Sequence, residues 1–201
     1  MKIDLHTHTS ERSACSIASL EEQLASAKSV GLDGIAVTDH DRFIPTREFI
    51  KIREAHAPFK IFTGIEVTVS ENEHILVIGL HDNALQKRGW NYSQLHQYVR
   101  RFNAFLAIAH PGRFQKFNLD IDRYPPDAIE LRSGNIHAPM IPPIAQLIDR
   151  VHVLPIYTSD AHSTNMIGKF YIETEHDIKD DAELVRTLKA GEFTCCEAHP
   201  L

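Results

Sequence analysis

Two histidines stand two positions apart in the stretch DLHTHT at residues 4–9. The stretch reads as a β-strand, and side chains on a strand alternate between its two faces, so His6 and His8 point in the same direction. Two neutral imidazoles that converge on one interior can bind a metal ion. A lone His-x-His pair also occurs on surface strands, so the rest of the sequence must show whether further ligands exist.

Further histidines and carboxylates stand at the ends of other predicted strands. They are Asp39 and His40 at the end of 33–40, Glu66 at the end of 60–67, His74 at the start of 74–80, His110 at the end of 105–111, Glu130 in 127–133, and Asp160 and His162 at the end of 153–162. Each of them alone has an ordinary explanation, such as a polar side chain that bonds to a backbone carbonyl. Together they indicate a multinuclear metal site, because the C-terminal strand ends of a parallel barrel meet at one mouth.

Amphipathic helices alternate with these strands. The segment 19–31 has apolar residues at helical spacing, Ser19 in the N-cap position with Glu22 three residues on, and Gly31 at its end. Further helices are predicted near 45–55, 92–103, 142–150 and 180–190. Strands and helices that alternate in this way predict an α/β fold with a parallel sheet or barrel.

Composition narrows the class of protein. The chain has 201 residues, of which 43% are hydrophobic and 24% charged, as expected for one globular domain over residues 1–201. Its net charge of −6 offers no basic field for a nucleic-acid backbone, so we do not expect a stable nucleic-acid complex. The longest apolar stretches, such as ILVIGL at 75–80, are too short to cross a bilayer, and the start of the sequence shows no apolar signal segment. Three cysteines without C-x-x-C spacing fit reduced thiols, so we expect a cytoplasmic protein with no membrane partner.

Five short motifs occur in a characteristic order. DLHTHT, TDHD (38–41), GIEV (64–67), AHPGR (109–113) and TSDAH (158–162) resemble, in order and approximate spacing, the motifs of the PHP family, the polymerase and histidinol phosphatase domains. The resemblance covers nearly the whole chain. The tail, about residues 163–201, also resembles the C-terminal PHP-associated segment of stand-alone phosphoesterases in this family.

The resemblance implies a fold and a set of metal ligands. The fold would be a distorted seven-stranded (β/α) barrel with two or three divalent ions, Zn, Mn or Fe, at the C-terminal strand ends. The ligands would be His6, His8, Glu66 and Asp160 for one metal, Glu66, His74 and His110 for a second, and His40 and His162 for a third. Glu66 could bridge two cations because a carboxylate has two oxygens, whereas an imidazole offers one lone pair to a metal.

The sequence departs from the family pattern at the third metal. The family usually has a further Asp or His ligand five or six residues after the His-x-His pair, where this chain has Ser13 and Ala14. Glu11, three residues after His8, is a candidate replacement ligand, although an acid in a polar loop is commonly solvated. Cys15 is either a soft ligand or a small buried residue, and we favour the second interpretation.

The resemblance also implies a function, a metal-dependent phosphoesterase that hydrolyses a small phosphorylated metabolite or nucleotide through a metal-activated hydroxide. Its catalytic residues would be Glu66, Asp160 and Arg113. Arg113 and Arg132 follow strand ends and could bind phosphate oxygens, as could Lys116 to a lesser degree, and His137 could protonate the leaving group. The sequence has no G-x-S-x-G, P-loop or G-x-G-x-x-G motif that would point to another mechanism.

Two alternatives stay open at this point. The chain could be an exonuclease-like phosphodiesterase, against which the absence of a basic groove argues. It could also be a non-catalytic, metal-binding regulatory domain, which the loss of ligands would favour, although nearly all ligands are present.

Overall fold

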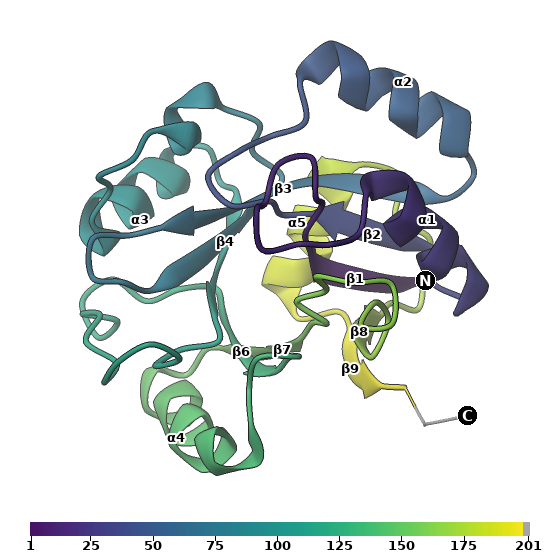
Figure 1. The fold of residues 1–201 in the computed structure, drawn as a ribbon. Helices are drawn as coiled ribbons and strands as arrows, with labels where there is room; N and C mark the ends of the chain where they lie inside the picture. Colours follow the sequence, from purple (N-terminus) through teal and green to yellow (C-terminus); the bar gives the residue numbers. More distant parts are fainter. Residues whose placement is uncertain (199–201) are drawn as a thin grey trace.

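A single curved sheet forms the centre of the molecule and five α-helices lie around it (Figure 1). The computed structural model describes residues 1–198. The strands are β1 (Lys2–Thr7), β2 (Gly34–Val37), β3 (Lys60–Thr68), β4 (His74–Ile78), β5 (Phe105–Ala109), β6 (Ala128–Arg132), β7 (Leu154–Tyr157), β8 (Phe170–Glu173) and β9 (Thr194–Glu197). The helices are α1 (Leu20–Ser29), α2 (Thr46–His56), α3 (Tyr92–Arg101), α4 (Ile141–Val151) and α5 (Asp181–Ala190), with short 3-10 helices η1 (Asn83–Gln86) and η2 (Ala138–Met140).

The sheet nearly closes on itself. Its strand order is β7-β6-β5-β4-β3-β2-β1-β8-β9, so β1 and β7 are not neighbours in the ladder. The segment after β7 nevertheless pairs with β1, because the N–H of His8 donates to the carbonyl of Ala161 at 2.9 Å and the N–H of Ala161 donates to the carbonyl of His6 at 3.1 Å. The expected barrel-like α/β fold is therefore confirmed.

The expected count of seven strands is wrong, because the described sheet has nine. β8 runs antiparallel to β1, and β9 runs antiparallel to β8. Both strands have only four residues, FYIE and TCCE, and both are partly exposed. Strands this short and open carry little of the apolar pattern by which a strand is recognised in a sequence.

The direction of β4 matters for the site. β4 runs antiparallel to both β3 and β5, whereas the sequence pattern predicted parallel strands. Its first residue, His74, therefore pairs with Thr68 near the end of β3 and with Ala109 at the end of β5. The reversal brings His74 to the same rim as the C-terminal ends of the neighbouring strands.

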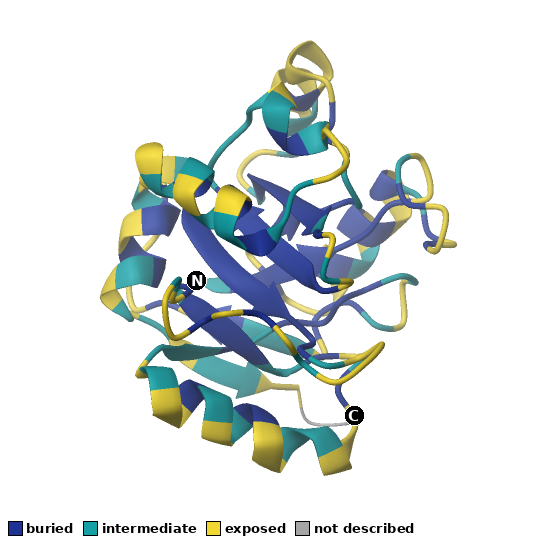
Figure 2. Cartoon of the chain, turned by 90° about the vertical axis from the view of Figure 1, so that its left-hand side faces the viewer, coloured by how far each residue is buried: buried dark blue, intermediate teal, exposed yellow. Residues whose placement is uncertain are grey.

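The strands fill the interior and the helices turn an exposed side to solvent (Figure 2). All residues of β4 and β5 are buried, in agreement with their uninterrupted apolar sequences. The predicted capping box of α1 is present, with the Ser19 side chain accepting from the N–H of Glu22 and the Glu22 side chain accepting from the N–H of Ser19. Among the described residues, no helix has the length and apolar character needed to cross a membrane.

Candidate metal centre

The structure brings together all eight residues that the sequence predicts as metal ligands. They are His6, His8, His40, Glu66, His74, His110, Asp160 and His162. Each lies near a strand end on one rim of the barrel, or within a few residues after one. The strand order of the sheet thus places residues from widely separated parts of the chain around one point.

Glu66 lies in the middle of this cluster. Its Oε1 is 2.9 Å from His74 Nδ1 and 3.1 Å from His110 Nε2. Its Oε2 is 3.0 Å from His40 Nδ1, 3.3 Å from His8 Nε2 and 3.4 Å from His6 Nε2. The two carboxylate oxygens therefore face two different sets of imidazoles, as a carboxylate shared between two cations would.

The donor atoms form three groups, each within 4.8 Å. The groups are His6, His8 and Asp160; His40, Glu66 and His74; and His8, His40 and His162. These groups differ in part from the predicted partition, because His40 lies with Glu66 and His74 as well as with His162. The third group consists of imidazoles alone, whereas each of the other two includes a carboxylate.

The cluster has the features of a cation site. Glu66 Oε2 is buried and accepts no well-aligned hydrogen bond, although three imidazole nitrogens lie within 3.4 Å of it. The Nε2 atoms of His6 and His8 face each other at 3.0 Å. Buried polar atoms normally have partners, and nitrogens and oxygens that crowd together without aligned hydrogen bonds are typical of ligands for shared metal ions. The residues present therefore fit divalent cations.

Neighbouring side chains orient the two imidazoles of the His-x-His pair. His6 Nδ1 is 2.7 Å from Glu130 Oε1, so Nδ1–H donates to this carboxylate and Nε2 is left for the centre. Ser13 Oγ donates to Asp39 Oδ1 at 2.6 Å and lies 3.2 Å from His8 Nδ1. Ser13 thus accepts from His8 Nδ1–H and leaves the Nε2 atom of that ring free as well.

The Glu130 contact leads to a prediction. Glu130 Oε2 accepts from the N–H of His110 at 2.7 Å, and Oε1 accepts from the Thr158 hydroxyl as well as from His6. In Glu130→Gln the amide nitrogen cannot accept, so either the His110 N–H or both the His6 and Thr158 donors lose their acceptor. We expect affinity for Zn²⁺ or Mn²⁺, measured by competition with a chelator, to fall about 10- to 100-fold. Thr158→Val is the control, since it keeps the His6 contact and should weaken binding much less; equal affinities for all three proteins would contradict the assigned role.

The cluster contains buried carboxylates that stay ionised beside imidazoles. Burial would raise the pKa values of Glu66 and Asp160, but the neighbouring imidazoles, His6 foremost, outweigh it and hold both pKa values well below their usual range. Burial lowers the pKa of His8 to about 4, which keeps its ring neutral. Burial also opposes charge on His6, yet the surrounding carboxylates raise its pKa well above the ordinary value. The ionised carboxylates thus attract positive charge, and a divalent cation would take the place of the proton on His6.

Two of the predicted ligands have an unusual backbone. His110 and Asp160 have φ angles of 27° and 49°, in the left-handed region that residues other than glycine seldom adopt. Such conformations are often found at functional sites, where the surrounding structure holds them in place. Here they occur directly after β5 and shortly after β7, where the His110 side chain reaches Glu66 and the Asp160 side chain reaches His6 and His8.

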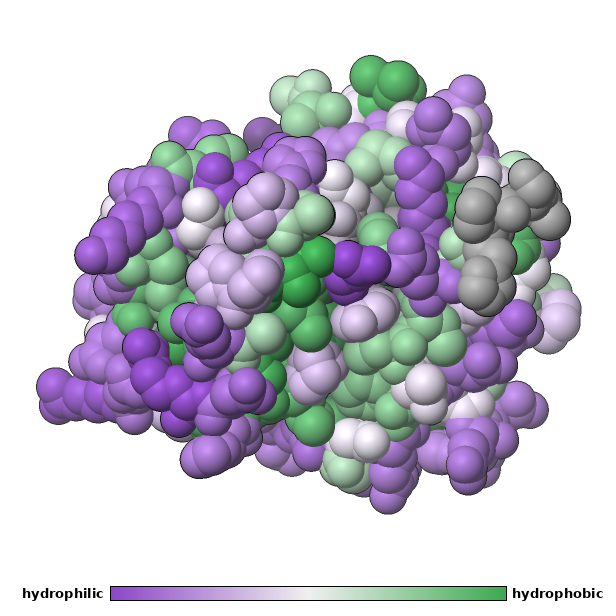
Figure 3. Space-filling model, turned by 90° about the horizontal axis from the view of Figure 1, so that it is seen from below, coloured by the Kyte–Doolittle hydropathy of each residue, from purple (hydrophilic) through white to green (hydrophobic). Residues whose placement is uncertain are grey.

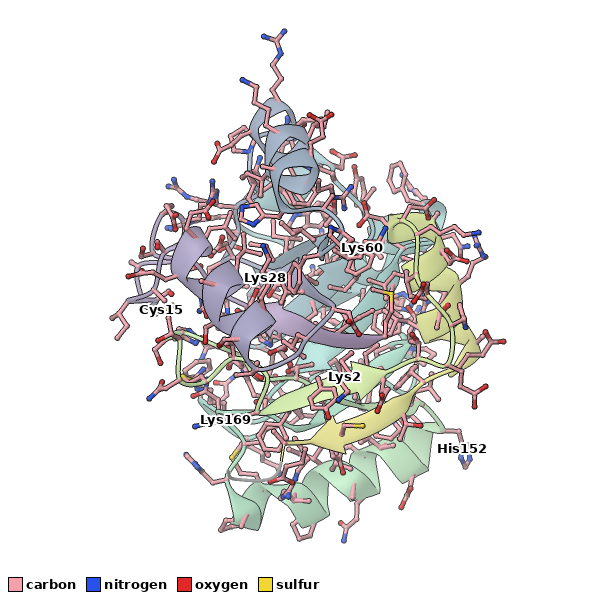
Figure 4. The ribbon with its side chains drawn as sticks, turned by 90° about the vertical axis from the view of Figure 1, so that its right-hand side faces the viewer. Lys2, Cys15, Lys28, Lys60, His152 and Lys169 are labelled. Carbon is pink, nitrogen blue, oxygen red and sulfur yellow. The ribbon has the colours of Figure 1, made fainter. Side chains whose placement is uncertain are left out.

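Several other predicted residues do not join the cluster. The carboxylate of Glu11 accepts from the N–H of Leu20 at the start of α1. The guanidinium of Arg132 pairs with Glu197 at 2.7 Å, and His137 is exposed at the start of η2. Cys15 is exposed on the loop between β1 and α1 rather than buried, so this expectation is wrong (Figure 4).

Arg113 and Asn135 do reach the cluster. Arg113 Nη1 lies 3.9 Å from Asp160 Oδ2, and the guanidinium stacks over the Phe114 ring at 4.9 Å. The side-chain amide of Asn135 donates to the same Asp160 oxygen. Asn135 was not among the predicted residues, although its place two residues after the predicted strand 127–133 was a usable signal.

A barrel-like α/β fold with a rim of converging imidazoles and carboxylates defines a class of metal-binding barrel proteins. Within this class, the family model described as PHP domain matches residues 4–134, and the model described as PHP-associated matches residues 145–193. The chain belongs to the PHP domain family, as its motifs predicted. No curated protein matches the sequence.

Solved structures share the fold. A two-domain protein from Bacteroides vulgatus, described as containing a predicted PHP-like metal-dependent phosphoesterase, is 18% identical with a TM-score of 0.73 over 98% of this chain and 64% of its own. PsfC from Pseudomonas syringae is 19% identical, with a TM-score of 0.68 over 92% of this chain and 87% of its own. The lesion-specific endonuclease PfuEndoQ from Pyrococcus furiosus is 19% identical, with a TM-score of 0.69 over 96% of this chain and 57% of its own. The chain thus spans less than two thirds of the Bacteroides and Pyrococcus proteins, and at these identities the likeness shows the fold.

Proposed function

We propose that this chain is a metal-dependent phosphoesterase that hydrolyses a small phosphorylated metabolite or nucleotide. The arrangement around Glu66 carries the proposal, because one carboxylate oxygen faces His74 and His110 while the other faces His6, His8 and His40. Such a carboxylate can hold two cations close together. When bound, two divalent ions neutralise phosphate charge and lower the pKa of a water molecule, which makes a nucleophile available near neutral pH.

The residues of this chain would divide the remaining tasks. His6, His8 and Asp160 would hold one ion together with Glu66, and His74 and His110 would complete the second site. Glu130 and Ser13 would keep the imidazoles of His6 and His8 in the tautomer that points Nε2 to the centre.

Arg113 would bind the substrate's phosphate. Its side chain is about one third exposed, at 32%, and its guanidinium stands beside the cluster without a close ion pair. It could turn from Asp160 to two phosphate oxygens, a geometry that suits a planar guanidinium. Arg132, the other arginine of the predicted set, is instead paired with Glu197.

A broad substrate screen tests the proposal. Chain loaded with Mn²⁺ or Zn²⁺ should hydrolyse at least one member of a panel of phosphomonoesters and phosphodiesters, measured as released phosphate or alcohol. The variant Asp160→Asn, purified in the same way, should be inactive and thus excludes a contaminating phosphatase. Activity on diesters alone would favour the phosphodiesterase alternative, and no hydrolysis by metal-loaded chain would overturn the proposal in favour of a regulatory domain.

A further inference from the structure

A large cleft opens beside the candidate metal centre. It measures about 800 Å³ and lies between the segment 111–119, which follows β5, and the segment formed by η2 and α4. Its size falls in the range of pockets that bind small molecules. None of the roles proposed above for the metal centre and Arg113 involves this cleft.

The lining of the cleft is largely apolar. Phe117, Leu119, Met140, Ile144 and Leu147 contribute side chains to it, and prolines stand along both walls. Seen from the side of α4, apolar side chains gather in the middle of this face and hydrophilic ones surround them (Figure 3). The cleft therefore favours an apolar body, because hydroxyl groups placed there would lose hydrogen bonds to water.

Cationic residues also line the cleft. Lys116 is exposed on one wall, and Arg150 of α4, whose Nε lies 3.2 Å from Asp122 Oδ1, belongs to the other. Uncharged polar residues line it as well, namely Gln115, Asn118 and Gln146. Apolar residues nevertheless make up most of the lining.

The chain segments that line the cleft lie next in sequence to residues of the metal centre. Pro111 and Gly112, which line the cleft, directly follow the candidate ligand His110. Arg113 comes from one wall and Asn135 precedes the other, and both side chains approach Asp160 Oδ2. A molecule with its phosphate at the centre can therefore extend between these two segments.

Phe114 lies on the segment 111–119 and places an aromatic ring beside the metal centre. Its side chain is 50% exposed although it is large and apolar. The ring lies with its centroid 5.2 Å from that of His74 and 6.2 Å from that of His110, so it borders the candidate ligands. An exposed aromatic ring at this place offers a surface on which an apolar group next to the phosphate could pack.

We propose that this cleft holds the leaving group of the phosphate ester and selects an apolar, ring-bearing alcohol over a polyhydroxylated one. The inference rests on the proposed phosphoesterase function and assigns it a substrate class. Phosphate would be bound by Arg113 and the metal centre, while the ring would lie against Phe117, Met140 and Leu147.

Two esters of similar chemistry test the selection. 2-Phenylethyl phosphate and glycerol 3-phosphate are both alkyl phosphomonoesters, so they differ mainly in the polarity of the leaving group. In the variant Leu147→Gln, we expect kcat/KM for 2-phenylethyl phosphate to fall about tenfold and kcat/KM for glycerol 3-phosphate to change less than about twofold. Phe102→Gln is the matched control, since Phe102 is also partly exposed but caps the end of α3, and it should leave both values unchanged.

A binding measurement separates this inference from the proposed function. 2-Phenylethanol should shift the methyl NMR resonances of Met140, Ile144 and Leu147 in the unmodified chain, whether or not any ester is cleaved. Hydrolysis of esters with an unchanged ratio of kcat/KM values in Leu147→Gln would overturn the inference and leave the phosphoesterase proposal intact. If no ester is cleaved, the proposed function fails; shifts of these resonances would still support the cleft as an apolar binding site, and unchanged resonances would overturn it too.

Discussion

Replacing Glu66 by glutamine should release metal from the centre and lower phosphoesterase activity by about two orders of magnitude or more. The substitution keeps the size of the side chain but leaves a single acceptor oxygen, so it cannot serve the imidazoles on both sides of Glu66. The charge that offsets two cations disappears as well. Changes outside the ligand sphere of a metal already lower affinity or activity about 10- to 100-fold, and a shared ligand should matter more.

Metal content per chain and kcat/KM on the same preparation provide the measurement. Glu54→Gln is a suitable control, because it makes the same chemical change on the exposed side of α2. Circular dichroism should show that the Glu66 variant keeps the fold. Full metal content together with an unchanged rate would show that Glu66 is not a ligand.

Removal and return of metal should reveal sites of unequal strength. Chelation should abolish activity, and stepwise addition of Mn²⁺ should restore it in a tight phase and a weak phase. The weak phase is expected from the group His8, His40 and His162, since three imidazoles without a carboxylate among them attract a cation less strongly than groups that include one. The side chains of His40 and His162 are also 27% and 17% exposed, whereas that of Glu66 is fully buried.

Two histidine variants should distinguish the phases. His162→Ala should remove the weak phase alone, because His162 belongs only to the imidazole group. His40→Ala should impair both phases, since His40 Nδ1 also lies 3.0 Å from Glu66 Oε2. His56→Ala, on α2 and away from the rim, should leave the titration unchanged. A single phase of recovery in the unmodified chain would contradict this account.

Much of the centre could be predicted from the sequence because its ligands are tied to strand ends. An apolar run locates a strand such as β5 within a few residues, and a histidine directly after it must then lie at an edge of the sheet. This reasoning found His110 and Asp160 without knowledge of their strained backbone. It could not place them relative to Glu66, because strand order is a property of long-range pairing.

The direction of β4 and the contacts of Arg132 and Glu11 were not predicted correctly, because all of them depend on long-range or side-chain pairing. The direction of β4 depends on its partners β3 and β5, and both directions fit the same apolar run HILVI. Arg132 is held by Glu197, a partner 65 residues away, and Glu11 bonds to the start of the following helix. Such contacts between distant or flexible polar side chains leave no periodic signal in the sequence.

The bridge between Thr7 and Ala161 has a consequence for the order of events during synthesis and folding. It joins the first strand to a segment about 150 residues later, and the same closure brings Asp160 to His8. Loops of this length close late, because a large loss of chain entropy precedes any gain from the contact. A nascent chain that has not yet been synthesised through residue 160 contains His6, His8, His40 and Glu66 but lacks the carboxylate of Asp160. Tight metal binding would therefore begin only after the segment around residue 160 has joined β1, and bound metal would in turn stabilise the folded form against reopening of this junction.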